Sequence, residues 1–213
     1  MKKVLSVVLA VMMLASLSVY AFADVNPSVT TKAAPEVDES SVTVEGLPEN
    51  TKVTVKLTAA ATEPDENATE EEKAEFEEKK KAVNNAIQAV TNNDNLAQAV
   101  KSAAAVATTS TKATDVYDTA EDAVPAVSDV FYFDAKDANG ESVLATEYVE
   151  GETPAVKVQV KVELPKNLMK VMQLVGDTWV EVPVVLNEDG EPVLELSYAG
   201  PIVFVVNANV ENG

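Results

Sequence analysis

The chain has 213 residues, 35 of them acidic and 16 basic, and it contains no His, Cys or Arg. These absences exclude a Ser/His/Asp triad, a cysteine nucleophile, a typical zinc site and a bidentate arginine clamp. The formal net charge of −19 repels phosphate backbones and anionic lipids, so nucleic acid and membrane surfaces are poor partners. Catalysis would need paired carboxylates, a perturbed lysine or an oxygen-ligated metal, and the spacing of the acids singles out no such pair.

The first residues have the order of a secretory signal peptide. A basic Lys2-Lys3 pair precedes an apolar run from Val4 to about Val19, and Ala21-Phe22-Ala23 has the small-x-small pattern of a cleavage site. The run is shorter than the roughly 20 residues of a spanning helix. We therefore expect residues 1–23 to be removed and the secreted chain to begin at Asp24. No Cys follows for lipid attachment, and no second apolar run is long enough to span a bilayer.

The mature chain is expected to form one domain. Residues 24–37, with two prolines and several Ser, Thr and Ala, predict a flexible leader. The domain is expected over 38–207, followed by a tail at 208–213. Near its start, apolar and polar residues alternate over 41–45 and again over 53–58, as in half-buried strands. The Gly-Leu-Pro-Glu-Asn sequence between them predicts that these two strands pair as a hairpin.

A helical insertion is expected at about 69–107. Thr69 and Glu72 have the spacing of a capping box. Four apolar residues then fall on one helical face, and a weaker, Ala-rich stripe follows: Phe76, Val83, Ile87 and Val90, then Leu96, Val100, Ala103, Ala104 and Ala107. Helices this short are marginal alone, so we expect them to pack on the strands instead of forming a separate domain.

From Asp129 onward the chain has almost continuous strand character. The clearest alternation covers 156–164, and Asn139-Gly140 predicts a type I′ hairpin turn. Further strands are expected over 168–175, 178–186, 192–198 and 202–207. Short strands punctuated by turns every roughly 8–12 residues are typical of a sandwich. The predicted fold is mainly β, an Ig-like antiparallel β-sandwich with a helical insertion.

Several of these segments occur together in a known group of modules. They are Ser128–Asp134, Asn139–Val143, Val156–Pro165, Trp179–Val182 and Gly200–Val206. Together they resemble the Ig-like β-sandwich modules of secreted and cell-surface proteins of clostridial Gram-positive bacteria, over about 128–207 and more loosely 41–59. The resemblance implies an extracellular or loosely surface-associated location and non-enzymatic work, and it carries no site residues. No Leu-Pro-x-Thr-Gly sorting motif follows Asn207, so covalent wall attachment is not expected.

Trp179 is the candidate ligand-binding residue. It shares a strand face with Glu181, opposite Val180, Val182 and Val184, so it has the position of an exposed platform on which a sugar could stack. A lone Trp in a sandwich more often packs over a core edge, and we favour that interpretation.

An acidic loop raises the question of a calcium site. Asp134, Asp137 and Asn139 surround Gly140. An EF-hand would need an acidic residue where Ala135 stands, and a bidentate Glu further on. A plain hairpin turn is therefore favoured over a weak calcium site.

A chain without disulfides also raises the question of an isopeptide bond between a lysine in an early strand and an asparagine in the last. Lys52, Lys56 and Asn207 are the candidates. Lys56 alternates with Val55 and Leu57, so it belongs to the polar face of its strand, and no such bond is expected.

The sequence thus predicts a non-catalytic binding or structural module that acts outside a Gram-positive-type bacterial cell. Its expected partner is an extracellular protein or glycan, and no cofactor or metal is expected. A secreted carbohydrate-binding module is the first alternative, and a carboxylate-based hydrolase is the second.

Overall fold

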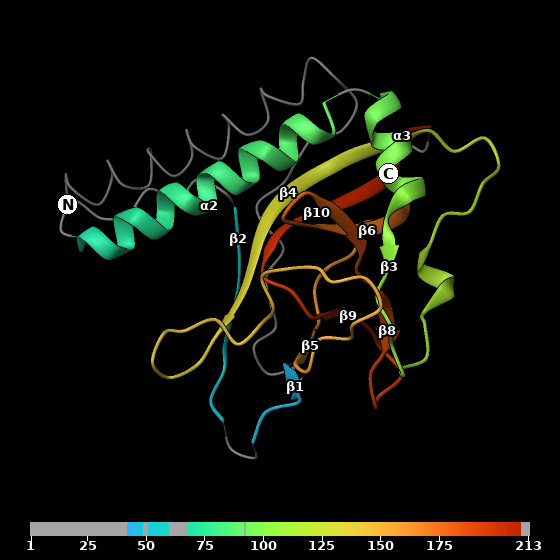
Figure 1. Cartoon of the computed structure of the whole chain (residues 1–213). Helices are drawn as coiled ribbons and strands as arrows, with labels where there is room; N and C mark the ends of the chain where they lie inside the picture. Colours follow the sequence, from blue (N-terminus) through green and yellow to red (C-terminus); the bar gives the residue numbers. More distant parts are fainter. Residues whose placement is uncertain (1–41, 49–50, 60–67, 92, 210–213) are drawn as a thin grey trace, which may run out of the picture.

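A computed structural model describes residues 42–48, 51–59, 68–91 and 93–209. The expected signal peptide, the leader and residues 210–213 of the tail lie outside these ranges. Two sheets pack face to face, and two helices lie on the outer face of the larger sheet (Figure 1). The predicted β-sandwich with a helical insertion is therefore confirmed.

The two sheets contain ten strands of the described chain. The smaller has the order β1 (Thr43–Glu45), β5 (Lys157–Val160), β9 (Pro192–Leu196) and β8 (Val184–Leu186). The larger has the order β2 (Thr54–Ala59), β4 (Pro125–Lys136), β10 (Gly200–Asn207), β6 (Leu168–Val175), β7 (Thr178–Glu181) and β3 (Ala104–Ala105). Neighbouring strands are antiparallel, except that β3 runs parallel to β7. The late strand β10 thus lies between β4 and β6.

The main core fills the space between the sheets. Phe133, Leu168 and Ile202 are almost fully buried there, and the rings of Phe131 and Phe204 lie 5.8 Å apart. The period-two alternation of the strands sends these side chains inward. Burial of apolar surface of this kind is the main favourable term in folding.

Helices α2 (Glu70–Ala89) and α3 (Asn93–Ser102) form the insertion. The predicted capping box is present, because the Glu72 N–H donates to Thr69 Oγ1 at 3.2 Å and the Thr69 N–H donates to Glu72 Oε2 at 2.7 Å. These contacts satisfy backbone donors that the first turn of a helix leaves unpaired.

Helix α3 covers a second apolar cluster on the outer face of the larger sheet. Leu96 and Ala99 pack there with Met172 and Val203. The helix ends at Ser102, so the expected helical limit at 107 is wrong. The next residues leave the helix because Ala104 and Ala105 pair with β7 as strand β3.

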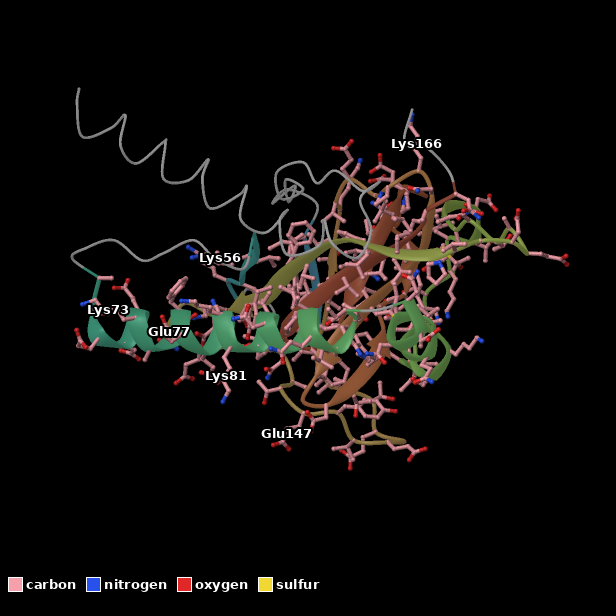
Figure 2. The ribbon with its side chains drawn as sticks, turned by 90° about the horizontal axis from the view of Figure 1, so that it is seen from above. Lys56, Lys73, Glu77, Lys81, Glu147 and Lys166 are labelled. Carbon is pink, nitrogen blue, oxygen red and sulfur yellow. The ribbon has the colours of Figure 1, made fainter. Side chains whose placement is uncertain are left out.

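Only part of α2 packs on the sandwich. Its buried residues, Val83 and Ala86, both lie in its second half. The N-terminal part of α2 extends past the sheet (Figure 1), where Figure 2 shows Lys73 and Glu77, and its contact with the sheet is polar, through the ion pair of Glu75 with Lys136 on β4 at 2.6 Å. Its exposed side chains form i,i+3 ion pairs, such as Lys73 with Glu70 at 3.0 Å. Pairs of this kind, together with the capping box, support a helix that has little tertiary packing.

The predicted hairpin between the first two strands is wrong. Strand β1 pairs with β5 in the smaller sheet, whereas β2 pairs with β4 in the larger. After β1 the chain presses against another segment at Gly46, which has a φ of 87°, and a Cβ at this position would overlap the carbonyl of Ala155. Gly46 therefore packs closely against the segment that precedes β5.

Two other predicted strands differ in extent. The strand expected at 178–186 is two strands, β7 and β8, in different sheets. The chain changes sheet at Pro183, which has no N–H to offer a continuing ladder. The strand expected at 156–164 keeps its side-chain alternation, since Val158, Val160 and Val162 are all buried, but ladder pairing covers only β5.

Candidate functional site

Trp179 lies on the outer face of the larger sheet. It is partly buried and packs against the cluster that includes Leu96 and Met172, while its neighbour Val180 is fully buried on the inner face. The predicted division of faces along β7 is therefore present. The cluster against which it packs combines residues of helix α3 with residues of strands β6 and β10.

The acidic loop forms a turn that uses its own carboxylate. Asp137 Oδ1 accepts the backbone N–H groups of Asn139 at 2.8 Å and Glu141 at 3.0 Å. These bonds hold the pKa of Asp137 below its usual value, and the bond from Glu141 has the largest effect. Gly140 N–H donates to the Asp137 carbonyl at 3.1 Å, so the central residues of the turn are Ala138 and Asn139, and the predicted type I′ turn centred on Asn139-Gly140 is wrong. Asp134 is buried and accepts the Ser142 hydroxyl at 2.7 Å.

A segment that we call the edge strap, residues 103–113, runs along one side of the sandwich. Its first part is β3, which extends the larger sheet beyond β7. Its last part pairs with β8 of the smaller sheet: Leu186 N–H donates to the Thr111 carbonyl, and Ala113 N–H donates to the Val184 carbonyl, each at 2.9 Å. One segment therefore covers the edges of both sheets. Bare strand edges are templates for pairing with other chains.

The middle of the edge strap covers a buried polar cluster, which we call the clasp. Glu195 extends outward from β9 because Leu194 and Leu196 face the core, and Lys157 and Gln159 extend outward from β5 in the same way. The strap adds Thr108 and Ser110 above them.

Glu195 lies at the centre of the clasp and is only 2% exposed. Its Oε1 pairs with Lys157 Nζ at 3.2 Å, and its Oε2 accepts from Gln159 Nε2 at 3.1 Å and from Ser110 Oγ at 3.0 Å. Burial raises the pKa of Glu195, but hydrogen bonds from Thr108, Gln159, Ser110 and Lys157 together bring it below its usual value. The carboxylate is therefore charged at neutral pH.

A serine and a lysine on the same face of a sheet raise the question of nucleophilic catalysis. Ser197 follows on the same face of β9 and is buried, and its hydroxyl has no hydrogen-bond partner among the described residues. Lys157 Nζ contacts the Glu195 carboxylate and also donates to the Ala107 carbonyl at 3.2 Å, and neither contact involves the Ser197 hydroxyl. These contacts attach the strap to the outer face of the smaller sheet.

Sequence reasoning missed the clasp. The alternation around Val158 places Lys157 and Gln159 on the outer face, so two members of the clasp could be predicted to lie on one surface. The contribution of Ser110 could not be predicted, because the connector that contains it has no periodic pattern to mark the residue that will contact Glu195.

Within the described part of the chain, no three acidic side chains converge in the way that a metal ion would need, and no helix there is long and apolar enough to cross a membrane. Comparison of the chain with protein-family models, with curated proteins and with solved structures finds no match.

Proposed function

We propose that this protein is a non-catalytic binding or structural module that works outside a Gram-positive-type bacterial cell. The observation that carries the proposal is the pairing of Lys157 with Glu195 under the edge strap. These two charged side chains are the closest to a catalytic arrangement, and they bind each other and attach the edge strap to the smaller sheet. The lack of His, Cys and Arg throughout the chain supports the same conclusion.

The extracellular location is supported by the sequence pattern of residues 1–23 and by the resemblance to Ig-like surface modules. The acidic surface suits a chain that must stay soluble among other macromolecules. N-terminal sequencing of the secreted product tests the location, with Asp24 expected as the first residue. A membrane-bound product that retains Met1 would contradict it.

The absence of catalysis is tested by replacing the clasp with an apolar pair, Lys157→Met with Glu195→Leu. Exchange of a buried ion pair for apolar residues often preserves folding, so thermal unfolding should remain cooperative. Retention of the mature chain on purified Gram-positive cell walls should equal that of the parent. Loss of a hydrolytic activity toward wall glycan or peptide in this folded variant would contradict the proposal.

A secreted carbohydrate-binding module is the alternative, and the partial exposure of Trp179 is the observation that keeps it in view. The chain has one Trp, so indole fluorescence reports on this residue alone. Our proposal predicts that wall glycans leave the emission unchanged and that Trp179→Ala lowers stability by about 2 kcal/mol through lost packing. A glycan-dependent shift in emission, together with glycan retention that Trp179→Ala abolishes, would favour the alternative.

A further inference from the structure

The edge strands on the two lateral sides of the sandwich are protected in different ways. On one side, β1 and β2 are the outermost strands of their sheets among the described residues. Strand β1 has only three residues, and β2 carries the exposed Lys56, which are two features that discourage edge pairing. On the other side, β7 and β8 are covered by the edge strap. This side therefore depends on the strap for its protection.

The clasp holds the middle of the strap, whereas its ends are held by packing, since Ala113 is buried in the main core and Ala104 packs against the cluster that includes Val180. Thr108 and Ser110 hold the strap to Glu195, and the Ala107 carbonyl holds it to Lys157. Removing a carboxylate and an ammonium from water costs about as much as their attraction returns. An apolar contact could supply the same stability, but directional hydrogen bonds fix one position of the segment.

We propose that the edge strap is a guard that keeps this protein monomeric, and that its release turns β8 into a self-association surface whose partner is β8 of a second copy. The inference goes beyond the proposed function, because this pairing does not depend on which glycan or protein the module binds.

The choice of a second copy follows from the hydrogen bonds that the strap makes. When the strap leaves, the N–H of Leu186 and the carbonyl of Val184 lose Thr111 and Ala113 as partners. An antiparallel copy of β8 offers the same donor and acceptor about a two-fold axis, so each strand can satisfy the other. Leu186 lies at this edge with a 38% exposed side chain, and pairing would cover it. The net negative charge opposes association, so added salt should strengthen it.

The double variant Thr108→Val with Ser110→Ala removes the strap's side-chain bonds to Glu195 and leaves both sheets unchanged. The matched control is Thr109→Val, because Thr109 is exposed on the same segment. At protein concentrations low enough to keep the double variant monomeric, hydrogen exchange should accelerate at least tenfold at the amides of Ala113 and Leu186 in the double variant only. Sedimentation velocity should then show a dimer that increases with protein and salt concentration, while the parent and the control stay monomeric.

The site of pairing can be mapped because the chain has no Cys. A spin label attached through Leu186→Cys should give a short distance between copies in the double variant. A label attached through Glu77→Cys, on the N-terminal part of α2 (Figure 2), should not.

Three results would overturn the proposal. The first is fast exchange of the Ala113 and Leu186 amides in a protein that stays monomeric at high concentration and high salt. The second is unchanged exchange in the double variant and also in Lys157→Met with Glu195→Leu, which would show that the clasp does not hold the strap. The third is a dimer whose short distance involves the Glu77→Cys label, which would place the interface elsewhere.

Discussion

The side-chain amide of Asn207 donates to the carboxylate of Asp118 at 2.9 Å, and its oxygen accepts the backbone N–H of Val124 at 3.1 Å. These bonds attach the end of the central strand β10 to the connector that precedes β4. The backbone N–H of Ala120 and then the Asn207 amide hold the pKa of Asp118 below its usual value.

Removal of this link should destabilise the whole fold. Asn207 is 2% exposed, and Asn207→Ala removes the bonds of its buried side chain to Asp118 and Val124, so it should lower the free energy of unfolding by about 2 kcal/mol. Urea unfolding measures the change. The neighbouring Asn209 is exposed, and Asn209→Ala should cost less than about 1 kcal/mol. Equal losses in the two variants would show that the link contributes nothing specific.

The mature chain should have the mass of its sequence from Asp24, with no internal cross-link. Strand β4 lies between β2 and β10, so Lys56 is one strand removed from Asn207, whose amide is already bonded to Asp118. An isopeptide bond would join lysine Nζ to the asparagine Cγ and release one ammonia. Intact-protein mass spectrometry detects that loss. A deficit of one ammonia that disappears in Asn207→Ala would contradict this prediction.

Two glycines with similar backbone angles should respond differently to alanine. Gly46 has a φ of 87° and Gly140 a φ of 85°. At Gly140 nothing lies within 4 Å of an added Cβ, whereas at Gly46 the Ala155 carbonyl blocks it. Gly140→Ala should cost about 1 kcal/mol of backbone strain, and Gly46→Ala about 2 kcal/mol more, because the backbone must move. Thermal unfolding of the two variants measures the difference, and equal melting temperatures would refute the close approach at Gly46.

The attachment of α2 to β4 should weaken in acid. Hydrogen bonds from Lys136 at 2.6 Å and Lys79 at 2.7 Å lower the pKa of Glu75 from 4.5 to about 2. A lowered pKa means that this carboxylate stabilises the fold above pH 4.5 and loses that effect as the pH falls toward 2. Because the side chain is 38% exposed, screening by solvent reduces the effect to about 1 kcal/mol.

The contribution of Glu75 can be isolated by comparison of variants between pH 4.5 and 2. The helix amides of the parent should exchange faster as the pH falls, after correction for intrinsic rates. Glu75→Gln should remove about 1 kcal/mol of that dependence. Glu71→Gln, an exposed change on the same helix, should leave it unchanged. An identical pH dependence in all three proteins would show that the ion pairs do not attach the helix.

Local patterns predicted the sandwich and the faces of its strands, but not the partners of those strands. The alternation around Val158 and the opposite faces of Trp179 and Val180 follow from the geometry of a single strand. The partner of β1 is β5, which lies far away along the chain, and no local pattern around Val44 marks it. The division of 178–186 at Pro183 had a local signal, since proline cannot donate to a ladder. For the clasp, the alternation placed Lys157 and Gln159 on the outer face, but no pattern marked Ser110 as their neighbour.

The central place of β10 has a consequence for the order of folding. Before residues 200–207 are in position, the larger sheet is two separate pieces, β2 with β4 and β6 with β7 and β3. Each piece presents an unpaired edge toward the gap. The long-range pairing that closes it must bring together segments from both ends of the domain, which is a slow step in folding. A chain interrupted before β10 would keep two unpaired strand edges, so aggregation and proteolysis would compete with folding until β10 pairs with β4 and β6.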